Sequence, residues 1–149
     1  VSSLLRIGSL DETGYLEEGE ALIAGDVKLD QEDIRKVQLA KSAICAGIQT
    51  MLHQAGLVES QLQELLIAGG FGSYLQVESA MAIGLLPPVA VERIKVCGNA
   101  ALAGAAWILQ DRARIQEAKK IADCAHTLNL ASDAFFQEQY MEGMFFPEI

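Results

Sequence analysis

The sequence predicts an α/β domain in which parallel strands are connected by crossover helices. Two short apolar runs, Leu65–Ala68 and residues 93–97, each end at a turn that contains glycine. A helical segment follows each turn, at residues 77–83 and at Ala100–Leu109. Because parallel strands need a crossover connection, a repeated order of strand, tight turn and helix favours a parallel pair.

Composition limits the class of protein. The 149 residues are 51% hydrophobic, which suits one domain with a sizeable core, and the apolar runs are too short to cross a bilayer. A net charge of -9 without a basic stripe argues against binding to nucleic acid or to anionic membranes. Three widely spaced cysteines without a C-x-x-C pair argue against a disulfide framework, a zinc site or a cluster in this segment. We therefore expect a soluble, cytoplasmic protein without a metal site of its own.

The first third of the chain predicts one long helix. Residues 1–8 are typical of the end of a helix that continues from something longer, and no signal peptide is evident. Residues 9–25 are acidic and rich in glycine, which indicates a surface loop with short strands at most. Asp30 and Asp33 predict a capped helix start, and Gly56 predicts its end. Its apolar stripe comprises Ile34, Val37, Ile44, Ile48, Met51 and Leu52.

One position of that stripe is not apolar. Lys41 stands where an apolar residue is expected, and Gln38 lies about one turn before it. Two interpretations are open. Lys41 could extend along the helix to water, or Lys41 and Gln38 could face a ligand across a cleft.

The glycine turn after the first predicted strand most constrains function. Gly69, Gly70 and Gly72 allow the backbone to turn sharply and to approach another group closely. A strand, a glycine turn and a helix in this order point backbone N–H groups at a ligand. The alternative is a turn that merely reverses the chain. Asn99 lies in the second tight turn, and the small residues at 100–106 allow close approach to a sheet or a nucleotide.

The rest of the chain predicts a charged helix at 112–125, a short strand at 128–130 and an aromatic helix at 133–144. There is no Walker phosphate loop, and Leu75 replaces the third glycine of a dinucleotide fingerprint. His53 and His126 lack a carboxylate or thiol at ligand spacing. The residues alone therefore identify no catalytic centre.

Four motifs in order resemble a known family. They are residues 33–44, 68–75, 82–87 and 98–105, and together they resemble the C-terminal part of the reductive activators of corrinoid proteins. The likeness runs from about Leu29 to the end and is thin over residues 1–28. It implies a ribonuclease H-like lobe of the acetate kinase, sugar kinase, chaperone and actin type of ATPase. It also implies a single domain that is a fragment of a larger, two-lobed one.

The resemblance implies one side of an ATP site. Gly69 and Gly70 match the adenosine motif of that superfamily, and Gln38 and Lys41 match the first-helix positions near adenine and ribose. The residues expected to contact the cofactor are Gly69, Gly70, Phe71, Gly72, Gln38, Lys41 and Asn99. Phe71 could stack near the base or anchor the turn in the core. Catalytic residues stay unassigned, and a phosphate clamp is expected upstream.

The family also implies cofactors and a partner. In its full-length members, an iron–sulfur domain precedes the ATPase region, and ATP with Mg is linked to reduction of cobalt(II) corrinoid to cobalt(I). The partner would be the corrinoid protein of a methyltransferase system. Two alternatives are an activator of a 2-hydroxyacyl-CoA dehydratase and a docking or dimerisation module. The second would use the aromatic C-terminal helix as its contact surface, with a homodimer as one form of it.

Overall fold

A computed structural model describes residues 1–148, except for the side chains of Phe71 and Ser73. The chain divides into two compact units, which are described separately. Unit 1 contains Val1–Leu62, Gln76–Val91 and the chain from Leu130 onward. Unit 2 contains Gln63–Leu75 and Glu92–Asn129. Each expected site residue therefore belongs to one unit or the other.

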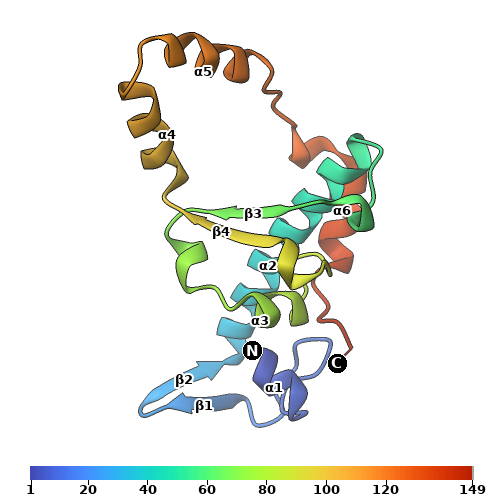
Figure 1. Ribbon diagram of the computed structural model, residues 1–149. Helices are drawn as coiled ribbons and strands as arrows, with labels where there is room; N and C mark the ends of the chain where they lie inside the picture. Colours follow the sequence, from blue (N-terminus) through green and yellow to red (C-terminus); the bar gives the residue numbers. More distant parts are fainter. Residues whose placement is uncertain (149) are drawn as a thin grey trace. The chain divides into compact units, whose positions relative to one another are not determined.

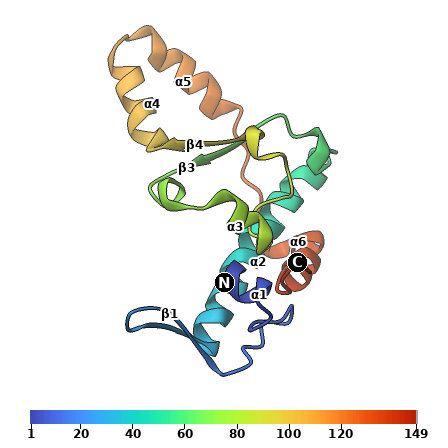
Figure 2. The same cartoon turned by 60° about the horizontal axis from the view of Figure 1, so that its bottom comes forward.

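Unit 1 is built around one long helix (Figure 1). Its elements are α1 (Ser2–Arg6), β1 (Glu20–Ala24), β2 (Val27–Asp30), α2 (Gln31–Gln54), α3 (Val77–Ala82) and α6 (Ala134–Glu142). Strands β1 and β2 form an antiparallel hairpin that leads directly into α2. Helices α2 and α6 lie side by side, as Figures 1 and 2 both show.

The start of α2 confirms the predicted cap. The Asp30 carboxylate accepts a hydrogen bond from the Asp33 backbone N–H at 2.9 Å, and the Asp33 carboxylate accepts one from the Asp30 N–H at 3.4 Å. These two bonds satisfy backbone donors that have no partner inside the helix. The helix ends before Gly56, which has φ +65°. This reciprocal cap fixes where the hairpin stops and α2 begins.

The buried face of α2 is more polar than the apolar stripe predicts. Ile44 and Met51 are 45% and 52% exposed, so the predicted stripe is wrong at these two positions. The face that is buried instead carries Ile34, Gln38, Lys41, Ser42, Ala46, Gly47, Thr50 and Leu52. The core of unit 1 gathers Leu4, Leu10, Leu16, Ile34 and Phe146. Phe146 therefore ties the C-terminal segment to the first helix and the loop after it.

Unit 2 contains the predicted parallel strands. Strand β3 (Leu65–Ala68) pairs in parallel with β4 (Ile94–Gly98), and Leu65 lies opposite Ile94. Helix α4 (Ala100–Leu109) follows β4, and α5 (Ala113–Asp123) follows α4 (Figure 1). Arg114 holds these two helices together, since its guanidinium lies 4.9 Å from the Trp107 ring and donates to the Trp107 carbonyl at 2.8 Å. The parallel pairing and the α/β class are confirmed.

One local prediction is wrong, and one strand was not predicted. Residues 128–130 do not form a strand, and a 3-10 turn occupies Leu130–Ser132 instead. The chain here already turns toward α6, whose N-cap is Asp133: its carboxylate accepts a hydrogen bond from the Phe136 N–H at 3.0 Å. The hairpin partner β2 was not expected as a strand.

Across the part of the chain that the structure describes, no helix is long and apolar enough to span a membrane.

Candidate functional site

The carboxyl ends of β3 and β4 join the two predicted turns. The Gly69 N–H donates to the Gly98 carbonyl oxygen at 2.6 Å, so the backbones of both turns are in direct contact. The register shifts just before this point, because Ile67 lies opposite Val96 but Ala68 lies opposite Gly98. Cys97 is therefore an extra residue in β4, and such bulges are common next to functional sites. The two turns form one continuous backbone surface at the end of the sheet.

Asn99 begins the helix that follows the second turn. Its side-chain oxygen accepts a hydrogen bond from the Leu102 N–H at 3.0 Å, which makes it the N-cap of α4. The residue is exposed. Its amide nitrogen stays available as a hydrogen-bond donor, since the cap uses only the oxygen.

The three glycines of the first turn meet different requirements. Gly69 has φ +101°, a conformation that residues with a side chain rarely adopt. A Cβ on Gly72 would lie 2.5 Å from Cγ2 of Ile67, so packing excludes a side chain there. Gly70 has φ -62° and ψ -33°, and a Cβ on it would have no heavy atom within 4 Å. Among the side chains that the structure describes, neither conformation nor packing requires glycine at position 70.

The other two expected contacts lie in unit 1. The Lys41 ammonium donates to the carbonyl oxygens of Gly143 and Phe145, both at 2.6 Å. The Gln38 amide donates to the Met144 carbonyl at 2.8 Å and to the Thr13 carbonyl at 2.9 Å. Lys41 is only 2% exposed, so the interpretation that it extends to water is wrong. Its side chain instead binds the segment that follows α6.

The position of α6 explains why Lys41 binds there, because Gly143 directly follows the last residue of that helix. The last carbonyls of a helix have no partner inside the helix and carry partial negative charge, and a lysine suits both conditions. Lys41 also lies 4.9 Å from the centre of the Phe146 ring, within range of a cation–π contact. Burial lowers the pKa of Lys41, while Cys45 nearby acts to raise it. Ser42 donates to the Tyr140 carbonyl and is thus the third residue on the same face of α2 that bonds to α6 or the segment after it.

The structure therefore sorts the expected site residues into two groups. Gly69, Gly70, Gly72 and Asn99 lie together at the end of the sheet in unit 2. Gln38 and Lys41 lie together on α2 in unit 1. The side chain of Phe71 lies outside the described residues. That Gln38 and Lys41 form the opposite wall of a nucleotide cleft stays a prediction.

Sequence reasoning missed the role of the C-terminal segment. The carbonyl groups of Gly143, Met144 and Phe145 give no sequence signal, because every residue has one. One signal was present, since Gln38, Lys41 and Ser42 share one face of a helix at spacings of three and four residues. Three donors on a buried face indicate acceptors in the element that packs against it.

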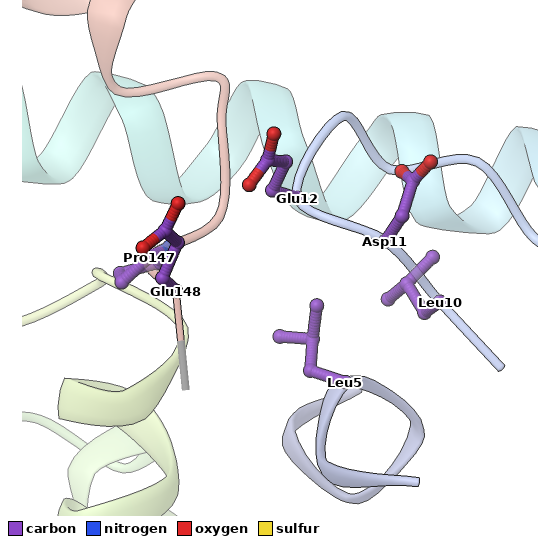
Figure 3. A pocket seen from close by; sticks show the side chains of 6 residues that line it. All are labelled: Leu5, Leu10, Asp11, Glu12, Pro147 and Glu148. Atoms are coloured by element: carbon purple, nitrogen blue, oxygen red, sulfur yellow. The ribbon is translucent and has the colours of Figure 1, made fainter. Parts of the chain in front are cut away.

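A pocket at the surface of unit 1 does not suit a nucleotide. It has a volume of about 340 Å³ and is lined by Leu5, Leu10, Asp11, Glu12, Pro147 and Glu148. Figure 3 shows the three carboxylates around the two leucines. A polyphosphate placed there would meet charges of its own sign. Within residues 1–148, no group of three or more His, Cys, Asp or Glu residues is arranged to hold a metal ion.

Parallel strands that end in joined glycine turns, each followed by a helix, are the arrangement expected for a lobe of the actin-like ATPase class. The family model described as the C-terminal domain of RACo, the ASKHA domain, matches residues 6–149. The chain belongs to this family. The match includes most of the leading segment, where the sequence resemblance was thin.

Individual relatives agree with this assignment. The chain is 36% identical over 128 residues to the corrinoid activation enzyme RamQ of Eubacterium limosum, a match that covers 86% of this chain and 22% of the relative. It is 24% identical over 139 residues to the [Co(II) methylated amine-specific corrinoid protein] reductase of Methanosarcina barkeri, covering 92% and 26%. A solved structure of a reductive activator for corrinoid, iron–sulfur protein matches with a TM-score of 0.84 and 29% identity, over 98% of this chain and 27% of that one. The chain thus spans about a quarter of the length of these relatives.

Proposed function

We propose that this chain is the part of an ATP-dependent reductive activator of a corrinoid protein that binds the adenosine end of ATP. The family match and the relatives, which are named for corrinoid activation and reduction, support the reaction. The relatives also favour this reading over an activator of a 2-hydroxyacyl-CoA dehydratase. The corrinoid partner would belong to a methyltransferase system.

One observation is the main support for the proposed nucleotide site. Gly70 has an ordinary helical backbone conformation with open space where a side chain would point. A bare backbone at this position suits a flat ligand that lies against the turn, because a side chain would collide with it. The Gly69–Gly98 contact holds both turns in one surface, and the exposed amide of Asn99 lies at the start of the next helix. These groups fit a sugar and a base better than a triphosphate, which requires positive charge.

The role of ATP follows from its place in the longer protein. When bound with Mg, ATP would supply the energy for an unfavourable reduction of cobalt(II) to cobalt(I), and the electron would come from the iron–sulfur domain that the family places upstream. This chain would contribute by holding the nucleotide in one lobe, so that closure of the two lobes depends on the nucleotide. A difference in affinity between open and closed states is required for such coupling. Since the described residues hold no cluster-forming group, no electron-transfer step is assigned to them.

A docking role for the C-terminal helix has less support. Much of the aromatic surface of α6 and of the segment after it is used inside unit 1, since Phe135 of α6 stacks on His53 at 4.1 Å and Phe146, beyond the helix, is buried. Met141 and Phe145 are exposed and remain available to a partner. A homodimer through this surface is therefore a second, smaller proposal.

The reaction is tested with the full-length protein and its corrinoid partner. We expect ATP-dependent formation of cobalt(I), followed by its absorbance, to fall strongly in Gly70→Val and to be unchanged in Gly104→Ala. Gly104 is also open, but it lies within α4 and away from the turn. Normal cobalt(I) formation in Gly70→Val would contradict the proposed site. Failure of the wild-type protein to reduce any corrinoid protein would contradict the proposed reaction.

A further inference from the structure

A small groove lies beside the first strand of unit 1. It has a volume of about 200 Å³ and is lined by Leu4, Ile7, Ser9, Leu16, Glu18, Glu20, Ala21 and Leu22. One wall comes from α1, the other from β1, and Leu16 between them is fully buried. The lining is thus mainly aliphatic, with two carboxylates.

Strand β1 borders this groove with an unpaired edge. In the described part of the chain, β1 pairs with β2 alone. Natural proteins protect such edges with charges, proline or bulges, yet residues 21–24 of β1 are all apolar. The bulge in the hairpin lies between Leu22 and Ala24, so the ladder from Glu20 to Leu22 stays regular. The stretch next to the groove is therefore a free, regular and apolar edge.

The exposed side chains around the groove are apolar. Leu22 is 65% exposed and Ile7 is 72% exposed, and both line the groove. A volume of about 200 Å³ lies below the roughly 300 to 1,000 Å³ that is usual for pockets that enclose a small molecule. It suits one or two aliphatic side chains. An extended segment that adds to β1 would place alternate side chains on the groove side.

The charges beside the groove indicate which kind of partner it binds. Glu17 and Glu18 are exposed beside the groove, and Glu20 shares its carboxylate with Lys28 at 2.6 Å. The whole chain carries a net charge of -9. A second copy would therefore bring acidic groups against acidic groups, which disfavours self-association. A partner with lysine or arginine near its apolar residues meets complementary charge instead.

We propose that the β1 edge and its groove bind an extended segment of a partner protein, in which alternate apolar residues are flanked by lysine or arginine. The segment adds as a third strand to the hairpin, through backbone hydrogen bonds to β1. One aliphatic side chain enters the groove between Ile7 and Leu22, and basic groups lie near Glu17 and Glu18. This surface lies in unit 1, and none of its residues belongs to the glycine turn.

The test uses labelled, capped peptides of about seven residues with apolar residues at alternate positions, flanked by lysine, serine or glutamate. Binding to the full protein is followed by fluorescence anisotropy at low and high salt. We expect the lysine-flanked peptides to bind about tenfold or more tightly than the glutamate-flanked ones, with a difference that shrinks in salt. Leu22→Ser should weaken binding by about tenfold, because it removes apolar surface from the groove. Glu18→Gln should reduce the difference in affinity between the lysine-flanked and the glutamate-flanked peptides.

The matched control is Ile23→Ser. Ile23 is the neighbouring exposed apolar residue, but it does not line the groove. Its replacement should leave binding unchanged. Equal losses in Leu22→Ser and Ile23→Ser, or equal binding of all three peptide classes, would overturn the proposal. Self-association of the wild-type protein that is lost in Leu22→Ser would also overturn the proposal, because the groove would then bind a second copy of the chain.

Discussion

The Lys41 ammonium lies 2.6 Å from the carbonyl oxygen of Gly143, at the point where α6 ends. Lys41 and Gln38 together donate to three consecutive carbonyls, those of Gly143, Met144 and Phe145. Position 143 has little room for a side chain, since a Cβ there would lie 2.9 Å from the Gln139 carbonyl oxygen. The two polar residues of α2 therefore anchor the C-terminal segment of unit 1.

Removing the lysine should weaken this anchor. In Lys41→Met, the carbonyls of Gly143 and Phe145 lose their donor, and we expect the free energy of unfolding to fall by about 2 kcal/mol. Lys36→Met is the matched control on the same helix, because Lys36 is exposed and makes only surface ion pairs with Glu32 and Asp33. Chemical denaturation measures both. Equal stability of Lys41→Met and Lys36→Met would show that the buried lysine contributes nothing.

The pKa of Lys41 predicts how stability changes with pH. Burial lowers this pKa from its ordinary value of 10.5. Between the folded value and 10.5, the unfolded chain binds a proton that the folded chain does not, so the free energy of unfolding rises with pH. The gain is complete above 10.5 and is lost as the pH falls through the folded pKa. From about pH 7 to pH 11, the free energy of unfolding of the wild type should therefore increase relative to that of Lys41→Met. Parallel curves for the two proteins would contradict a lowered pKa.

Substitutions at the glycines of the turn should differ in their effect on stability. Gly72→Ala places a Cβ against Ile67 and should destabilise unit 2 by about 1 to 3 kcal/mol. Gly70→Ala meets open space in an ordinary conformation and should change stability little. Thermal denaturation of both variants measures this difference. A Gly70→Ala variant as unstable as Gly72→Ala would mean that position 70 is structural.

Much of the fold follows from local sequence. The strand at Leu65–Ala68 and the helix at Ala100–Leu109 have the predicted bounds, because short apolar runs, glycines and a capping residue act over a few neighbours. The cap at Asp30 is predicted for the same reason. The hairpin is harder, since β2 is only four residues long and its partner lies in an acidic stretch.

The candidate site is only partly predictable. The glycine turn is visible in the sequence, but the separate reasons for Gly69, Gly70 and Gly72 require coordinates. The partners of Lys41 are backbone carbonyls more than 100 positions away along the chain, and they carry no signature in side-chain type. An interruption of an apolar stripe therefore indicates that a residue is special without indicating what it binds.

The chain by itself should not be an ATPase. The turn from Gly69 to Leu75 offers backbone groups and no lysine or arginine, whereas phosphoryl transfer requires positive charge or a metal around the terminal phosphate. Phosphate release from this 149-residue chain should stay near background, while the full-length protein turns ATP over. Comparable ATPase activity in both would show that a phosphate site lies within these residues.

The affinity of the full-length protein for ATP tests the central claim most directly. Isothermal titration should show that Gly70→Val weakens ATP binding by about 2 kcal/mol or more, roughly thirtyfold, because the new side chain occupies the space of the ligand. Gly104→Ala should bind ATP like the wild type, and circular dichroism should show that both variants are folded. ATP affinity equal to wild type in a folded Gly70→Val protein would contradict the assignment of this turn to the nucleotide.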